Sequence, residues 1–528
     1  MRIRNVAMWV ALAALPMAAG AFIRQNRQAA DGARLFTQVL QRIEDNSVDS
    51  LSRSAIYEKA ARGLVKHIQD PYADLYSPEE LASFQRNTLR NDYGGLGMQI
   101  GQQDDQIVVI QVFPNTPAAA GGLQSGDHII LVDTSSVIGW RTQQVSERLI
   151  GKPGTSVDVT VRRVGVPQPI KGRFTRAIIR VPAVPYPLVL DGSVGYIPLQ
   201  AFNNSASGDV GKALVGLRSR GVRSFVIDLR GNGGGALDQA LDISNLFLKP
   251  GQEIASVRHR GRQPEVYSAN RPAPVIDSMA VVVLVDGASA SASEIVAGSL
   301  QDHDRALIVG TTSYGKGLVQ TLFPIDGGWA VKLTTGKWYT PSGRSIQAEH
   351  ERLEDDRFVE YAPDSAAARA DSARKRPVFK SDAGRTILGG GGVTPDLVIT
   401  PDTTNAAERE LGRAVAPTLQ AWLTTIAALG VDMKPNLKPD FTITPEIREE
   451  FFSRLMKAKV GITRAQFDAA QFSVDRLLEL ELTRWAFGDS TRLRRSIRYD
   501  QQLGSALELL RRSPTQRQLL AMAEAKKQ

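Results

Sequence analysis

The sequence predicts an α/β core with an inserted β-rich domain and helical regions near both ends of the chain. Between residues 177 and 403, short apolar strand patterns alternate with amphipathic helix patterns, which is typical of a layered α/β fold. Residues 91–176 contain several short strands separated by glycine turns and one helix pattern. Residues 31–90 and 404–528 carry apolar residues at spacings of three and four, which indicates helices.

Length, composition and charge limit what the chain can be. Its 528 residues exceed what one hydrophobic core accommodates, so we expect several domains. The chain has no cysteine, which excludes disulfides and a cysteine nucleophile, and none of its five histidines lies in a metal-ligand spacing such as HExxH. We therefore expect no metal and no cofactor. The net charge of +9 is a mild excess without the basic motif of a nucleic-acid module, so nucleic acid is not an expected partner.

The N-terminal segment, residues 1–30, has the pattern of an export signal. Arg2 and Arg4 precede the uncharged residues 6–23, and Ala19-Gly20-Ala21 provides a candidate cleavage site. The uncharged stretch is also long enough to cross a bilayer, so a cleaved signal peptide and an uncleaved membrane anchor fit equally well. In both cases we expect the rest of the chain outside the cytoplasm, in the periplasm or cell envelope, either secreted or anchored in the inner membrane.

Residues 31–90 are expected to form an N-terminal helical region. Apolar residues from Leu35 to Ile43 recur three and four positions apart. Asp70-Pro71-Tyr72 interrupts the helical pattern. Ser77-Pro78 then marks the start of a further helix, with proline at the first helical position.

The β-rich region, residues 91–176, begins with the glycine turn Tyr93-Gly94-Gly95-Leu96-Gly97. The elements predicted after this turn are the strands Ile107–Val112 and His128–Val132, a helix around residues 145–150, and the strand Val157–Val161. Their order resembles a PDZ domain. Such a domain binds the end of another chain as an additional strand.

The resemblance to a PDZ domain implies a peptide-binding site on this region. We expect backbone N–H groups around Gly95, Leu96 and Gly97 to receive the terminal carboxylate of a bound peptide, as in an anion-binding nest. Val145 and Leu149 on the predicted helix are the further peptide-binding candidates. A glycine-rich turn alone is more often only a turn, so the prediction depends on the whole ordered set of elements.

The α/β core is predicted over residues 177–403. The predicted strands are Val194–Leu199, Ser224–Leu229, Ala280–Val285, Ala306–Val309 and Trp329–Thr334, and the predicted helices fall at about 205–220, 236–248 and 293–302. A polar stretch, residues 348–383, separates the segment at 341–347 from Gly392-Val393-Thr394-Pro395-Asp396 and has the composition of a surface insertion.

Residues 404–528 are predicted to form a C-terminal helical extension. Thr444-Pro445-Glu446 starts one helix, and the apolar residues that follow it favour core or dimer contacts over a ligand site. Arginines cluster between residues 492 and 498 and again at residues 511 and 512. A solvated helix face explains such clusters best, and a surface for nucleic acid or anionic lipid is the alternative.

Residues 286–320, DGASASASEIVAGSLQDHDRALIVGTTSYGKGLVQ, carry the candidate chemistry. Ser291 lies just before a predicted helix, and Lys316 lies between two glycines after a predicted strand. A serine needs a base to become a nucleophile, and a lysine is that base only when it is uncharged, which a dry apolar pocket favours. The alternatives are a helix-capping serine, with Glu294 at the third helical position, and a solvated lysine.

The segment resembles the carboxyl-terminal processing peptidases, also called tail-specific proteases, through S-A-S-A-S-E-I and G-K-G-x-V-Q. The resemblance covers roughly residues 35–400 and is strong from about residue 93. It implies an α/β serine-protease core in which Ser291 is the nucleophile, Lys316 is its base and Gln320 orients the lysine. It also implies that residues 31–90 pack beside the protease and pair subunits into a homodimer or higher oligomer.

An oxyanion hole is predicted beside Ser291. Ala292 lies at the start of a predicted helix, where the helix dipole favours negative charge, so its backbone N–H is one candidate donor. The resemblance implies a second donor from the glycine turn at residues 228–235, and Gly234 or Gly235 is the candidate.

Asp302 matches an acidic position of the family, and we expect it to fix local structure. His303 would lie about 18 Å from Ser291 along one helix, which argues against a serine–histidine triad.

These inferences together predict an exported serine endopeptidase. Its PDZ domain would recognise protein or peptide substrates with apolar C-terminal tails, and its Ser-Lys dyad would cleave them. The alternative is a catalytically silent PDZ adaptor on a protease-like fold. The intact serine, lysine, glutamine and glycine turn argue against that alternative.

Overall fold

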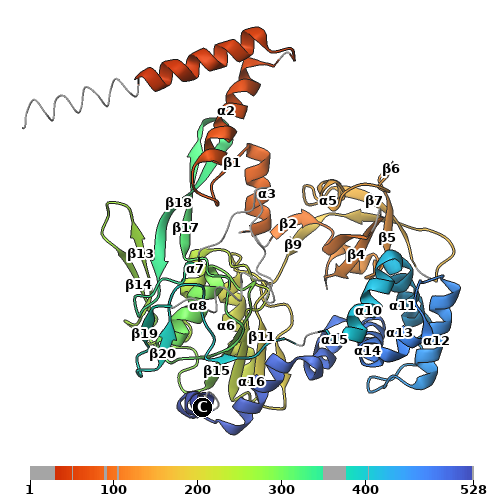
Figure 1. Ribbon diagram of the computed structural model, residues 1–528. Coiled ribbons are helices and arrows are strands. Elements are labelled where there is room, and N and C mark those ends of the chain that lie inside the picture. The colour runs from red at the N-terminus through yellow and green to blue at the C-terminus, as the bar shows by residue number, and fades with distance from the viewer. Residues whose placement is uncertain are drawn as a thin grey trace, which may run out of the picture. The chain divides into compact units, whose positions relative to one another are not determined.

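The computed structural model describes residues 30–525, except residues 50, 89–91, 104–105, 114, 164, 349–375 and 402–403 (Figure 1). Nearly all of the predicted signal peptide or anchor, residues 1–30, and most of the predicted surface insertion, residues 348–383, lie outside the described residues. The chain divides into two compact units. The first consists of the residues up to Leu81 together with Gln320–Thr334, and the second of Ala82–Val319 together with the residues from Thr335 onward.

The first unit contains the predicted N-terminal helices, the first part of a predicted strand, and two strands, β1 and β17, that the sequence patterns did not predict. Its elements are a helix at residues 30–46, α2 (Arg53–His67), β1 (Asp74–Tyr76), the start of α3 (Pro78–Thr88), most of β17 (Leu318–Ile325) and the first part of β18 (Trp329–Tyr339). β1 pairs antiparallel with β18, so that Leu75 lies opposite Val331. Asp70 supports this pairing because its carboxylate accepts hydrogen bonds from the backbone N–H (2.7 Å) and the hydroxyl (2.9 Å) of Thr334.

The β-rich region of the second unit folds as a six-stranded sheet in the order β3-β4-β5-β7-β8, with β6 paired to β5. Its elements are β3 (Met98–Gln103), β4 (Gln106–Val112), α4 (Pro117–Ala120), β5 (His128–Val132), β6 (Ser135–Ser136), α5 (Thr142–Leu149), β7 (Ser156–Arg162) and β8 (Ile170–Thr175). Val157, Val159 and Val161 alternate along β7 and are all buried, as expected for a strand with one face on a core. The predicted strands and the helix are confirmed.

The core of the second unit is a six-stranded sheet in the order β10-β11-β12-β15-β16-β21. Its strands are β10 (Leu188–Leu190), β11 (Val194–Pro198), β12 (Ser224–Asp228), β15 (Ala280–Val285), β16 (Leu307–Gly310) and β21 (Leu397–Val398), and its helices are α6 (Ala206–Arg218), α7 (Leu237–Ser244) and α8 (Ala292–Asp302). All neighbouring strands are parallel except β10 and β11. Every residue of β15 is buried, because a parallel sheet is covered on both faces. The predicted α/β fold class is therefore confirmed.

The main departures from the predicted core elements are in α7 and β18. α7 ends at Ser244, earlier than predicted, because the N–H groups of Leu246 and Phe247 donate three residues back, to Ile243 and Ser244, and the chain continues as a tighter turn. β18 continues to Tyr339, and its last part pairs antiparallel with β13 (Glu253–His259). β13 pairs in turn with β14 (Glu265–Ser268), and β19 (Val378–Lys380) pairs with β20 (Thr386–Leu388). The sequence patterns did not predict these short pairs.

The C-terminal extension is helical, as predicted. Its helices are α10 (Ala406–Val415), α11 (Leu419–Met433), α12 (Pro445–Lys457), α13 (Arg464–Ala469), α14 (Gln471–Phe487), α15 (Asp489–Ser496), α16 (Gln501–Arg512) and α17 (Gln516–Ala525). Among the described residues, one helical stretch, Ala406–Met433, is long and apolar enough to cross a membrane. Trp422 and Ile426 within it are buried against Phe451 and Phe467, in the core that α10 to α14 form.

Arginines of the basic cluster at residues 492–498 form ion pairs. Arg495 and Arg498 both contact the carboxylate of Glu479, which is buried. In the second cluster, Arg511 pairs with Asp191 at 2.5 Å. These arginines therefore contribute to folding contacts.

Candidate active site

Ser291 occupies a strained turn between the buried strand β15 and helix α8. It is the residue directly before α8, with φ 56° and ψ −111°. Residues with a side chain rarely adopt positive φ, and such a conformation costs about 1–3 kcal/mol. Ser291 is half-buried, whereas its neighbours Ala290 and Ala292 are buried. The hydroxyl of Ser291 is thus partly accessible at the start of α8, while the residues on both sides of it are buried.

A single buried carboxylate joins the serine turn to the loop that carries Lys316. The backbone N–H of Ser291 donates to Oε2 of Glu294 at 2.7 Å, and the backbone N–H of Lys316 donates to the same oxygen at 2.9 Å. The other oxygen, Oε1, accepts from the hydroxyl of Ser313 at 2.6 Å and from the N–H of Gly315 at 2.7 Å. Because two nitrogens bind one oxygen, the backbones of Ser291 and Lys316 are close neighbours.

Glu294 is an acid in a dry site. Its side chain is fully buried, and this burial raises its pKa from 4.5 to about 7, although the four hydrogen bonds act in the opposite direction. All four partners donate to the carboxylate, which has four acceptor positions when ionised. The geometry therefore matches the charged form, while the surroundings penalise it.

The loop around Lys316 is held on both sides of the lysine. Its carbonyl accepts a hydrogen bond from the indole N–H of Trp338 at 3.1 Å, and the N–H of Gly317 donates to Oε1 of Gln347 at 2.9 Å. Gly315 has φ 88°, and a Cβ there would lie 2.6 Å from the Cβ of Ala348, so only glycine fits. Lys316 itself is half-buried. The loop fixes the backbone from which its side chain extends.

The predicted glycine turn contacts Ser291 directly. Gly234 has φ 96°, and a Cβ there would lie 2.7 Å from the carbonyl oxygen of Ala290, 2.9 Å from the nitrogen of Ala292 and 3.0 Å from the Cβ of Ser291. The structure therefore brings Ser291, Ala292 and Gly234 together. The N–H of Gly234 donates to the side chain of Asn232 at 2.9 Å, so this amide already has a partner within the turn.

Asn232 connects the glycine turn to the serine turn. Its carbonyl oxygen accepts hydrogen bonds from the hydroxyl of Ser293 at 2.8 Å and from the N–H of Ala290 at 3.1 Å. The side-chain amide donates to the carbonyl of Leu199 at 2.7 Å. Gly235, with φ 152°, follows in the same turn, and a Cβ there would lie 2.4 Å from the carbonyl oxygen of Phe202.

Gln320, the predicted lysine-orienting residue, belongs to the first compact unit. Its side-chain nitrogen lies 3.5 Å from the hydroxyl of Thr334, within hydrogen-bonding distance. The contact with Lys316 stays a prediction.

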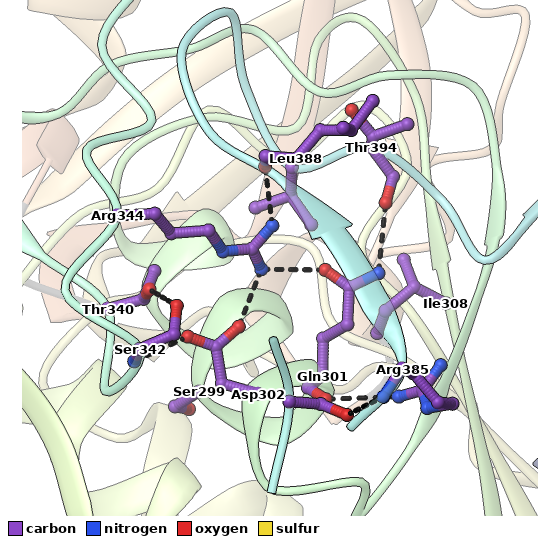
Figure 2. A network of polar contacts seen from close by, with 12 residues as sticks. Ser299, Gln301, Asp302, Ile308, Thr340, Ser342, Arg344, Arg385, Leu388 and Thr394 are labelled. Atoms are coloured by element: carbon purple, nitrogen blue, oxygen red, sulfur yellow. Dashed lines mark hydrogen bonds and ion pairs between the residues drawn. The ribbon is translucent and has the colours of Figure 1, made fainter. Parts of the chain in front are cut away.

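Asp302 lies in a buried polar network at the far end of α8 from Ser291 (Figure 2). Its Oδ1 accepts a hydrogen bond from Arg344 at 2.7 Å, and its Oδ2 accepts from the N–H of Ser342 at 2.9 Å. Arg344 is fully buried and also donates to the side chain of Gln301 at 2.7 Å. These contacts tie the end of α8 to the loop after β18. They support the expectation that Asp302 fixes local structure.

His303 is also at the far end of α8. Its Nδ1 lies 2.7 Å from Asp382, and its Nε2 lies 2.7 Å from the carbonyl oxygen of Glu253. Both ring nitrogens therefore have partners away from Ser291. Within the part of the chain that the structure describes, no group of three or more histidine, aspartate or glutamate side chains is arranged to hold a metal ion.

The predicted peptide-binding residues lie in and beside the core of the β-rich region. Leu96, Val145 and Leu149 are buried there. Gly97 has φ 82°, and a Cβ would lie 2.3 Å from the Cβ of Thr116. A Cβ at Gly95 would meet the ring of Tyr93 at 2.5 Å. These glycines are needed for close packing, and their contacts with a peptide stay a prediction.

The sequence did not predict that Glu294 connects the serine turn to the Lys316 loop, and it indicated only a capping residue. The capping contact is present, since Glu294 binds the N–H of Ser291. The available signal was a glutamate in a helix whose residues 292–302 are otherwise small, apolar or uncharged up to Asp302. Such a helix is buried on all sides, and a buried acid requires several partners.

Comparison with known proteins adds a family context to this geometry. The family model described as Peptidase family S41 matches residues 193–357, and the PDZ domain model matches residues 94–171. The first match includes the glycine turn, Ser291 and Lys316, and the second includes the predicted peptide-binding residues. The helices from α10 onward lie beyond both matches.

The chain is also similar to individual relatives and to solved structures. The carboxy-terminal-processing protease of Bartonella bacilliformis is 36% identical over 316 residues, which cover 59% of this chain and 72% of that protein. The carboxy-terminal processing protease CtpA of Bacillus subtilis is 31% identical over 306 residues, which cover 58% of this chain and 65% of that protein. Among solved structures, a photosystem II D1 C-terminal processing protease is 28% identical with a TM-score of 0.35, covering 58% of this chain and 82% of that one.

Proposed function

Because the chain belongs to peptidase family S41, the family of the carboxy-terminal-processing proteases, we propose that Ser291 and Lys316 form its catalytic dyad. The chain is a serine-type peptidase with a PDZ domain. In the proposed reaction, Ser291 attacks the scissile carbonyl while Lys316 accepts its proton and passes it to the leaving amine. Water then hydrolyses the acyl-enzyme, and Lys316 acts as base again.

One observation carries this proposal. The backbone N–H groups of Ser291 and Lys316 share a single carboxylate oxygen of Glu294, which keeps two residues from different elements at one site. A capping serine alone would not need a strained backbone, and the positive φ of Ser291 is typical of a functional position.

The oxyanion would form beside the start of α8. The N–H of Ala292 is the first donor, since it opens the helix and lies next to Ser291. Of the two glycines proposed for the second donor, Gly235 is favoured, because the N–H of Gly234 already binds Asn232. The glycine turn would thus supply one amide to the reaction and one to its own structure.

Substrates would be proteins whose apolar C-terminal tails bind the PDZ domain. β3 ends the strand order of its sheet, and α5 lies beside it, so a peptide can add there as a further strand. Export fits the uncharged N-terminal segment, residues 6–23. Pairing of subunits through residues 31–90 belongs to the same proposal.

The test uses purified Ser291→Ala and Lys316→Ala variants and an unfolded protein with an apolar tail. We expect each variant to lose cleavage by at least about a thousandfold, because the nucleophile and the base act as a unit. Lys337→Ala, an exposed lysine on β18, is the matched control and should cleave like the wild type. Mass spectrometry of the products measures cleavage.

A substrate that ends in two aspartates tests the tail recognition, and we expect it to be cleaved more slowly at low concentration. The dyad would be wrong if either alanine variant kept wild-type cleavage. If a fluorophosphonate never labelled Ser291, even with a bound peptide, the chain would be a silent PDZ adaptor instead.

A further inference from the structure

The last two helices, α16 and α17, cover one face of the core sheet. Leu503, Leu507 and Leu510 of α16 are buried in the same cluster as Val226 and Val282 of the central strands. The family match ends at residue 357, so these helices are an addition to the matched core. Their packing places the start of α16 at the end of strand β12, where the glycine turn begins.

At this point an arginine joins the two segments. Asp500, directly before α16, accepts hydrogen bonds from Arg230 on both carboxylate oxygens, at 2.9 Å from Nη1 and 2.7 Å from Nη2. The two residues are 270 positions apart in the chain. Nη1 of Arg230 also donates to Oε1 of Gln502 at 2.9 Å. Such a two-fold contact fixes the orientation of the planar guanidinium as well as its position.

The same arginine also binds Asp228 at the end of β12. Nε of Arg230 donates to one oxygen of Asp228 at 2.9 Å, and Nη2 donates to the other at 2.6 Å. The hydroxyl of Tyr196 donates to Asp228 at 2.8 Å. Burial lowers the pKa of Arg230, while the carboxylates of Asp228 and Asp500 raise it, and the net shift is upward. One cation thus lies between two carboxylates, and losing either would leave it less compensated.

Arg230 is the residue that enters the glycine turn. Gly231 follows it, and its N–H binds Asp286 at 3.0 Å. Gly234, three residues later, touches Ser291. A change in the direction of Arg230 therefore moves the start of a turn whose other end lies against the reactive serine.

We propose that Asp500 is a positioning residue for the glycine turn, acting through Arg230, so that helix α16 completes the active site. The inference rests on the proposed function, because it assumes that the turn supplies an oxyanion donor. Asp500 does not touch the substrate. Its role is to hold the arginine that precedes the turn, and the C-terminal extension is thereby part of the catalytic core.

The first experiment measures kcat and KM of the full-length Asp500→Asn variant. Asparagine still caps α16 well but removes the charge and the two-fold contact. Losing an oxyanion donor costs about a hundredfold or more in kcat, so a displaced turn should cost about tenfold, with KM within about twofold. The rate of fluorophosphonate labelling of Ser291 should fall in proportion.

Arg511→Gln is the matched control. It removes another ion pair between α16 and the core, to Asp191, at the opposite end of the same helix. We expect wild-type kcat and labelling from it. A loss of kcat in the control equal to that in Asp500→Asn would mean that any loosening of α16 has the same effect, and would overturn the specific role of Asp500.

A double-mutant comparison tests whether Asp500 acts through Arg230. If it does, Asp500→Asn should cost nothing further in kcat once Arg230→Gln is present. An equal loss in both backgrounds, or wild-type kcat in Asp500→Asn, would overturn the inference. If Asp500→Asn fails to fold, Arg230→Lys tests the same contact, because lysine cannot hold two carboxylates side by side. Wild-type kcat in Arg230→Lys would also overturn it.

The wild type separates this inference from the proposed function. If the wild type shows no cleavage and no labelling that depend on Ser291, the proposed function itself has failed. If the wild type cleaves and labels normally and Asp500→Asn matches it, only the role of Asp500 has failed.

Discussion

The hydrogen bonds and the burial of Glu294 favour opposite protonation states. Its four donors require an ionised carboxylate, while complete burial favours the protonated acid and raises its pKa to about 7. A protonated Glu294 would have fewer acceptor positions for the N–H groups of Ser291 and Lys316. The protonation state of Glu294 is thus coupled to the backbone geometry of Ser291 and Lys316, the two proposed catalytic residues.

This conflict predicts a pH dependence of stability. Because the folded pKa of Glu294 is raised from 4.5 to about 7, the native state keeps a proton that the unfolded state has lost. The free energy of unfolding should therefore fall as pH rises from about 4.5 to about 7, by about 3 kcal/mol, and stay level above that range. Denaturant unfolding at several pH values, for the wild type and Glu294→Gln, measures it.

The difference between the two proteins isolates Glu294, because all other titrating groups are common to both. The difference curve should carry the slope between about pH 4.5 and 7. Parallel pH curves for the wild type and Glu294→Gln would contradict the prediction.

Site residues could be predicted from the sequence where they belong to a short, local sequence motif. Ser291 and Lys316 stand in short motifs with glycines and small residues, and the structure brings their backbones together. Asn232 and Ser313 were not predicted, because asparagine and serine in turns have many possible roles. Their functions depend on partners contributed by other segments.

At the scale of elements, α8 is held at both of its ends. Ser291 and Glu294 fix its start, and the network around Asp302 fixes its end. Burial lowers the pKa of Arg344, yet the carboxylate of Asp302 keeps a compensating charge beside it. The helix that carries the proposed nucleophile at one end is therefore anchored at the other by an ion pair that is fully buried.

Replacing Asp302 by asparagine should destabilise the protein strongly. The change leaves the buried guanidinium of Arg344 without this carboxylate, and breaking such a pair costs about 3–5 kcal/mol. Asp158→Asn is the matched control, since Asp158 and Arg173 form a similar contact at 2.7 Å on the surface. There we expect no measurable change, because water replaces the lost partner. Urea unfolding of both variants measures the difference, and equal unfolding curves would refute the prediction.

Helices and strands could be predicted from the sequence where their apolar pattern is long and uninterrupted. β12 and β15 are apolar runs in a parallel sheet, and the predicted boundaries agree with the structure to within one residue. β1 has three residues and a polar start, so its pattern is too short to distinguish from a turn. Its partner β18 lies far along the chain, and single-sequence patterns do not reveal such pairing.

At the scale of the whole molecule, the C-terminal helices belong to two different cores. Those from α10 to α14 surround Trp422 and Phe451, whereas α16 and α17 complete the core of the main sheet. The sequence predicted helices throughout this region but not this division, because an apolar stripe indicates burial without indicating the partner.

The membership of α16 in the main core leads to a whole-molecule prediction. Leu503→Ala should reduce the free energy of unfolding of the core by about 2–5 kcal/mol, because the side chain is almost fully buried against the sheet. Leu419→Ala, at an exposed position on α11, is the control and should have little effect. Hydrogen exchange in β15 reports directly on the core and should become faster in Leu503→Ala. Unchanged exchange there would show that α16 unfolds separately.

Because Ser291 is the proposed nucleophile, its left-handed backbone affects which replacement suits an inactive variant for trapping substrates. Alanine has a Cβ, as serine does, and therefore retains the conformational penalty and the shape of the turn. Glycine would remove both the hydroxyl and the penalty, and the turn would be free to relax. A substrate complex of Ser291→Ala would thus keep the strained turn conformation of the wild type. In a complex of Ser291→Gly the turn could adopt a different, unstrained conformation.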